Sequence, residues 1–250
     1  MSDVIYVTNT PVMERVHYFP RQLITADDMR AEQEYFRQKM RRHNRFLHGW
    51  GVVCGLMVTA APSADKPWQV QVAEGYALSP QGDEIYVPEA VCLDLAKCGF
   101  AAQPHPCEPG VMVVPQRRGK KNILYIAVRY VECPSRPVRI HPAGCGCDET
   151  GCEYSRIRDD YDLSCMDELP ATHRTITRGR SMCEFIKDGI TPACPPCPED
   201  PWVVLAAVNY PTNMSTPLTD DMINNRARRE LFSTAVIQEQ VVECCCNQKG

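Results

Sequence analysis

The sequence predicts an α+β protein with an N-terminal helix, an antiparallel β domain that carries a Cys-rich insertion, and a C-terminal helix. Apolar residues recur every three or four positions over residues 25–48, whereas several later runs alternate apolar and polar residues. A hydroxyl followed by two carboxylates at Thr219 marks the start of the second helix. The expected parts are an extended attachment arm (1–24), a helix (25–48), the β domain (49–210) with its insertion (132–201), and a C-terminal helix with its tail (211–250).

The N-terminal helix has clear start and stop signals. Thr25 and Asp28 form a capping-box pattern, the first half of the helix is acidic and the second half basic, and Gly49 follows the last turn. Six residues spaced alternately by four and three form a heptad seam. The helix can either pack against its own domain or associate with other copies through this seam, with the polar members setting the register. The seam residues are Met29, Gln33, Phe36, Met40, His43 and Leu47.

Short strands are predicted after the helix, because apolar residues then recur with a period of two. The strand at 52–58 is interrupted by Gly55, and the run Trp202 to Val208 is apolar enough for a strand buried on both faces. The basic stretch 117–121 is expected to form the solvent-exposed tip of a hairpin. The other expected strands are 68–72, 75–78, 84–87, 91–95 and 122–131, with a turn at 80–83.

Composition excludes several classes of protein. The chain has 250 residues, a formal net charge of −4 and 44% hydrophobic residues, so we expect a globular chain and no nucleic-acid partner. No apolar run approaches the roughly 18 residues of a membrane span, and the first residues do not resemble a secretory signal peptide. We therefore expect a protein that is assembled in the cytoplasm with its thiols reduced.

Cysteine is unusually frequent, with 15 residues of which eight lie between positions 133 and 197. The segment 132–201 has few apolar residues and is too long for a structureless loop in a compact domain, so something other than hydrophobic burial must hold it. One structural zinc ion is the first hypothesis, because two separated thiolate pairs can close a tetrahedral site. Disulfides and unbound buried thiols are the alternatives. The candidate ligands are Cys145, Cys147, Cys152, Cys194 and Cys197.

Catalytic motifs are missing from the sequence. It has no phosphate-binding loop, no dinucleotide-binding glycine pattern and no nucleophile elbow, and its six histidines form no metalloprotease pattern. The Cys194-Pro-Pro-Cys197 pair precedes a strand and not a helix, which disfavours a thiol-redox site. We therefore expect no enzymatic activity.

Four stretches of the chain resemble a bacterial family that is found with phage-tail-like particles. The most specific is HNRFLHGWGVVCGL at residues 43–56, and the others are RVHYFPRQLITADD at 15–28, VQVAEGYALSPQGDEI at 70–85 and CEYSRIRD at 152–159. The family is similar to the N-terminal modules of phage baseplate and tail-fibre proteins and to components of contractile injection systems. The resemblance implies a non-enzymatic structural subunit, a homotrimer that contacts other baseplate or tail subunits.

The expected function is therefore that of a baseplate-attached adaptor or short fibre in a contractile phage-tail-like particle. Two other classes stay open. One is a zinc-dependent enzyme that uses the Cys-rich segment, which would need three protein ligands and an open position on the metal. The other is a receptor- or carbohydrate-binding module of a fibre, which would show an exposed aromatic cluster drawn from Tyr154, Tyr161 and Trp202.

Overall fold

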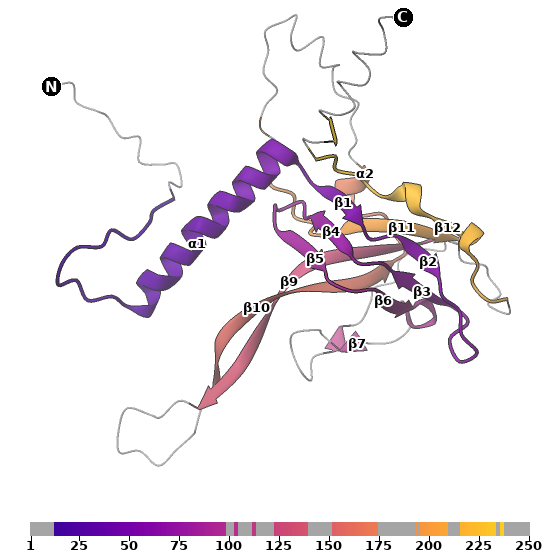
Figure 1. Cartoon of the computed structure of the whole chain (residues 1–250), viewed down its shortest axis with the longest axis horizontal. Helices are drawn as coiled ribbons and strands as arrows, with labels where there is room; N and C mark the ends of the chain where they lie inside the picture. The colour runs from indigo at the N-terminus through magenta and orange to yellow at the C-terminus, as the bar shows by residue number, and fades with distance from the viewer. Residues whose placement is uncertain are drawn as a thin grey trace, which may run out of the picture.

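The structure is a computed structural model with an α+β fold, as the sequence predicts, and it has a β body from which one helix and one β ribbon extend (Figure 1). It describes residues 13–98, 103–104, 112–113, 123–139, 152–174, 194, 196–209, 216–233 and 236–237. The helix is α1 (Ala26–His43), which continues as a short π-helical turn (Asn44–His48). A second helix, α2 (Ala171–Arg174), is a single turn.

All the paired strands are antiparallel. One sheet has the order β1-β4-β5, a second β2-β3-β6 and a third β10-β9-β11-β12, and β7 pairs with β8. The strands are β1 (Gly51–Gly55), β2 (Val58–Ala60), β3 (Gln69–Val72), β4 (Gly75–Leu78), β5 (Glu84–Val87), β6 (Val91–Asp94), β7 (Gln103–Pro104), β8 (Met112–Val113), β9 (Ile123–Arg139), β10 (Cys152–Met166), β11 (Val203–Asn209) and β12 (Ile223–Asn224).

One hydrophobic core joins the three larger sheets. Alternate residues of the short strands point inward, as in β3 and β5, whereas β11 is buried on both faces as its unbroken apolar run predicts. Trp68 has only 1% of its surface exposed. The largest fully buried side chains include Trp68, Leu56, Ile85, Leu95, Ile126, Leu205 and Leu218.

The described parts of the expected Cys-rich insertion are mainly a long β ribbon. β9 continues past residue 132 to Arg139, and β10 pairs with it from Cys152 to Met166. The far end of this ribbon lies away from the body (Figure 1). Because most of its outer residues are polar on both faces, no period-two pattern marked these strands in the sequence.

The predicted helix that starts at Thr219 is wrong over residues 219–233. Two 3-10 turns flank the two-residue strand β12, and Arg228 is extended. The side chain of Asn225 binds both backbone groups of Val58, and the backbone of 229–231 pairs with Val52. These hydrogen bonds with β1 and β2 outweigh the helical propensity of the segment. Beyond residue 233, only Val236 and Ile237 are described. The rest of the predicted C-terminal helix lies outside the described residues.

Candidate functional site

The helix α1 forms where the sequence predicts it. Asp28 N donates to Thr25 Oγ1 at 3.2 Å and Thr25 N donates to Asp28 Oδ2 at 2.8 Å, which completes the capping box. These bonds from the backbone and hydroxyl of Thr25 hold the pKa of the Asp28 carboxyl below its usual value. The π-helical turn stops at Gly49, whose φ of 84° is readily adopted only by glycine.

A polar stripe of the helix contacts the β body. Arg37 Nη1 lies 2.5 Å from Glu132 Oε1 on β9, and Arg41 Nε lies 2.6 Å from Asp83 Oδ1 in the turn between β4 and β5. One turn further on, the buried Asn44 donates from Nδ2 to the carbonyl oxygen of Gly82 at 2.9 Å. The helix is thus attached to the body by hydrogen bonds and ion pairs at its C-terminal half.

The seam lies on another face of the helix and is exposed along its length. Successive residues of a helix are about 100° apart, so Phe36 points well away from Arg41, whereas Met40 lies only about 60° from Arg37 and borders the polar stripe beside Asp83 and Glu132. Phe36 is 55% exposed, Met40 54% and Leu47 69%, and α1 itself has no buried residue. Met29, Gln33 and His43 are also exposed. The described residues therefore leave the seam largely exposed, although the neighbouring polar stripe attaches the helix to its own domain, and association through the seam stays a prediction.

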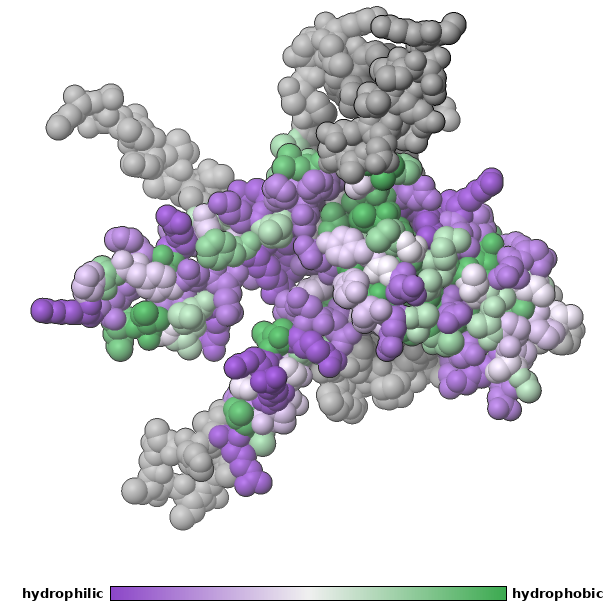
Figure 2. Space-filling model, viewed as in Figure 1, coloured by the Kyte–Doolittle hydropathy of each residue, from purple (hydrophilic) through white to green (hydrophobic). Residues whose placement is uncertain are grey.

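The described part of the arm, residues 13–24, adds further exposed apolar side chains beside the start of α1. Leu23 is 85% exposed and Phe19 58%, and the Tyr18 hydroxyl donates to the carboxylate of Glu32 on α1. Hydrophobic residues are visible among hydrophilic ones on this projecting part of the molecule (Figure 2). This part of the arm therefore leaves apolar side chains exposed beside the start of α1.

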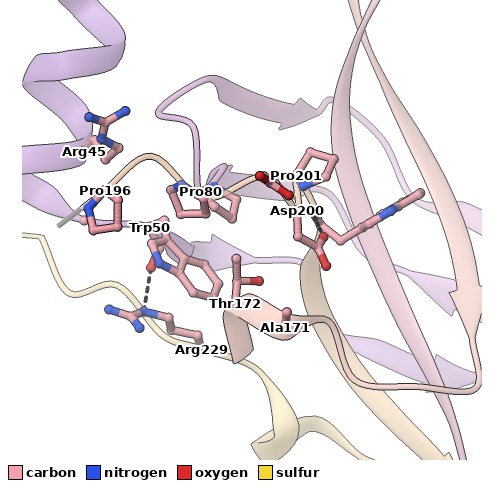
Figure 3. Close-up of a pocket in the computed structure, with 13 residues that line it drawn as sticks. Arg45, Trp50, Pro80, Ala171, Thr172, Pro196, Asp200, Pro201 and Arg229 are labelled. Carbon is pink, nitrogen blue, oxygen red and sulfur yellow. Dashed lines mark hydrogen bonds between the residues drawn. The ribbon is translucent and has the colours of Figure 1, made fainter. Parts of the chain in front are cut away.

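A second feature is a hollow of about 1010 Å³ beside the end of the helix, which we call the Trp50 hollow. Its walls come from segments far apart in the sequence: the end of the π-helical turn, the turn after β4, α2, the segment before β11 and residue 229 (Figure 3). Its apolar lining includes two tryptophans and four prolines: Trp50, Trp202, Pro80, Pro196, Pro198 and Pro201. Its charged lining consists of two arginines, Arg45 and Arg229, and two carboxylates, Glu199 and Asp200.

Trp50 is held between the side chains of Arg229 and His173. The guanidinium carbon of Arg229 lies 4.4 Å from the centre of the Trp50 ring, and Arg229 Nε donates to the Trp50 carbonyl oxygen at 3.0 Å. The His173 ring meets the Trp50 ring edge-on at 4.7 Å, and its Nε2 accepts a bond from Val204 N at 3.1 Å. Burial, with a contribution from the charge of Arg229, lowers the pKa of His173 to about 4. This histidine is therefore neutral at pH 7 and acts as an acceptor.

The zinc site stays a prediction. Cys152 lies exposed at the far end of the ribbon, Cys194 and Cys197 are exposed free thiols beside the Trp50 hollow, and Cys145 and Cys147 lie outside the described residues. Among the residues that the structure describes, no three His, Cys, Asp or Glu side chains gather as metal ligands would. The disulfide alternative gains support among the described residues, because Cys98 and Cys165 are disulfide-bonded to each other and Cys133 is disulfide-bonded as well.

The aromatic residues considered for a fibre-tip site have different surroundings. Tyr154 is 51% exposed on the ribbon, Tyr161 packs against the core, and Trp202 lies at the hollow under the guanidinium of Arg129 at 4.7 Å. They therefore form no common cluster. None of the described helices is both long and apolar enough to cross a membrane.

Comparison with known proteins gives little further information. No family model matches the chain, and no curated protein matches it. One solved structure that it resembles is described as the crystal structure of TssK, with 10% sequence identity and a TM-score of 0.33. The likeness covers 82% of this chain and only 40% of that chain. A similarity this low carries no argument about function.

Proposed function

We propose that this protein is a non-enzymatic structural subunit of a contractile phage-tail-like particle, a baseplate-attached adaptor or short fibre that assembles through the seam of α1. The observation that carries the proposal is the exposure of Met29, Phe36 and Met40 along one face of the projecting helix α1, with Leu47 exposed in the π-helical turn that follows. Single exposed apolar residues are common on protein surfaces, but a row at heptad spacing is typical of a helix that packs against other helices.

The polar attachment of α1 supports this interpretation. In most amphipathic helices the apolar face packs against the core. Here Arg37, Arg41 and Asn44 contact the body, and the apolar face is left for a partner. A second and a third copy of the chain offer the same seam, and three such helices can bury it in a short coiled coil. The particle itself is proposed from the family resemblance, which covers most of residues 15–210.

Incorporation into particles tests the proposal. Phage-tail-like particles are purified from cells that produce either the natural protein or the Phe36→Asp, Met40→Asp variant, because carboxylates in an apolar seam are costly to desolvate. The matched control, Ala31→Asp with Gln38→Asp, adds two carboxylates to the same helix away from the seam. We expect the seam variant to be absent from the particles and the control to be present. Equal amounts of both variants in the particles would contradict the proposal.

The arm is the second attachment element in this proposal. Extended segments often dock by adding a strand to a neighbour's sheet edge. Removal of residues 2–14 is expected to leave the thermal unfolding transition unchanged and to abolish incorporation. Normal incorporation of the shortened protein would remove the arm from the proposal and leave the seam unaffected.

A further inference from the structure

We propose that His43 and His48, where α1 passes into the π-helical turn, bind a divalent late transition cation such as zinc, with both imidazoles as ligands and water in the other positions. Both ligands come from one chain, and His48 has no part in the proposed assembly. The inference therefore goes beyond the proposed function and does not depend on it.

The π-helical turn brings the two histidines together. In a regular α-helix each residue adds about 100°, so side chains five positions apart lie on different faces. Here the turn closes with a bond from Gly49 N to the Asn44 carbonyl oxygen at 2.9 Å, which spans five residues. This wider turn brings the His48 ring next to the His43 ring, with 5.4 Å between their centres. Such turns occur frequently at functional sites.

The separation of the rings suits one shared metal ion. A ligating imidazole nitrogen lies about 2 Å from zinc, and the ring centre lies roughly 1 Å behind it, so two imidazoles at a tetrahedral angle have their centres about 5 Å apart. The observed separation is 5.4 Å, and the ring planes are tilted by 59°. Small rotations of the two side chains are then enough to direct one nitrogen of each ring at the same ion.

Both rings are available to a ligand. His43 and His48 are exposed, and neither makes a hydrogen bond or an ion pair within the described part of the chain. His173 is different, because it is buried and its Nε2 accepts a bond from Val204 N at 3.1 Å. The neutral imidazole is a common metal ligand and suits zinc, copper and nickel.

The charges nearby permit a cation at this position. Arg41 pairs with Asp83 at 2.6 Å, and the guanidinium carbon of Arg45 lies 4.7 Å from the centre of the Phe46 ring. Arg42 is exposed, so water and salt screen its charge. The carbonyl groups at the C-terminal end of a helix favour positive charge. With two protein ligands and water on the metal, we expect binding to be reversible.

The ring signals of the histidines provide the test. The full chain, with ¹³C at Cε1 of its histidines, is titrated with zinc whose free concentration is set by a competing chelator, because free thiols also bind the metal. The pH is kept above the range in which histidine ordinarily takes up a proton. We expect the His43 and His48 signals to shift together, at a free zinc concentration at least about tenfold below the one that shifts the exposed His17.

Three variants connect the shifts to the pair. His48→Gln is expected to weaken zinc binding at His43 at least about tenfold, and His43→Gln to do the same at His48, because each removes one of two ligands. His17→Gln is the matched control and is expected to change nothing. All three side chains are exposed, so the variants are expected to fold.

Four results would overturn the inference. These are shifts of His43 and His48 at different zinc concentrations, an unchanged response of His43 in the His48→Gln variant, an equal response of His17, and no shift of either ring.

Discussion

Arg41 Nε on α1 lies 2.6 Å from Asp83 Oδ1, so the projecting helix is bonded to the turn between β4 and β5. Both side chains are mostly shielded from water, with 21% and 12% of their surface exposed. Next to this pair, the backbone of Gly82 lies directly against the backbone of Arg41, because a Cβ added at Gly82 would be 2.3 Å from the Arg41 carbonyl oxygen. The position of the helix therefore depends on a glycine in a β turn.

Gly82→Ala is expected to loosen α1, and Gly49→Ala is its matched control. Both glycines have a positive φ, 95° and 84°, so each alanine costs about 1–3 kcal/mol in backbone strain. At Gly49 the new Cβ finds its nearest atom 3.9 Å away, whereas at Gly82 it collides with Arg41. We expect Gly82→Ala to lower the free energy of unfolding by a further ~1–3 kcal/mol, measured by urea denaturation. Equal losses for the two variants would show that the close approach is unimportant.

Arg228 is expected to be the most sensitive arginine for stability. Its guanidinium donates to the carbonyl oxygens of Leu205, Gly55 and Leu56 at 3.0–3.1 Å, and so links β11 to the end of β1. Lysine keeps the charge but cannot reach all these acceptors, so Arg228→Lys is expected to cost about 2–4 kcal/mol. The exposed Arg226 supplies the control, since Arg226→Lys is expected to change stability by less than about 0.5 kcal/mol. Thermal and urea denaturation measure the free energy of unfolding of both variants. Equally small changes for Arg228→Lys and Arg226→Lys would refute this role.

His173 is expected to make the fold sensitive to acid. Its pKa is about 4 in the folded protein and 6.5 ordinarily, so between these values the unfolded chain binds more protons. The stabilisation is complete above pH 6.5 and is lost as the pH falls towards 4. Urea denaturation at several pH values in this window should show a falling free energy of unfolding, and His173→Gln should flatten the decline. An equally steep decline of the free energy of unfolding in the His173→Gln variant would show that other titratable groups cause it.

The disulfide between Cys98 and Cys165 is expected to stabilise the contact between β10 and the 3-10 turn that follows β6. The two Cα atoms are 5.8 Å apart, and the residues are separated by 67 positions in the sequence. Replacing both cysteines with serine should lower the free energy of unfolding by about 2–4 kcal/mol. Serine at Cys54 and Cys92, which are exposed free thiols, should have little effect. Mass spectrometry of unreduced peptides checks the bond directly, and free thiols at both positions would contradict it.

Local signals in the sequence predicted the local structure well. The capping box at Thr25, the stop at Gly49 and the short strands up to β6 follow from patterns within a few residues. Arg228 was missed because its acceptors lie on segments about 20 and 170 positions away, while its own neighbourhood has a helical period. The Trp50 hollow was missed for the same reason, since its walls come from distant parts of the chain. The seam residues could be recognised from their spacing, but only the structure shows that the polar face of the helix contacts the body.

The most direct test of the account is the mass of the purified protein in solution, measured by light scattering over a range of concentrations. If the seam of α1 joins three copies, the mass will be three times that of the 28.2 kDa chain. The Phe36→Asp, Met40→Asp variant will then have the mass of one chain, and the Ala31→Asp, Gln38→Asp control will keep the mass of three. A mass of 28.2 kDa for the natural protein at every concentration, or an unchanged oligomer in the seam variant, would contradict it.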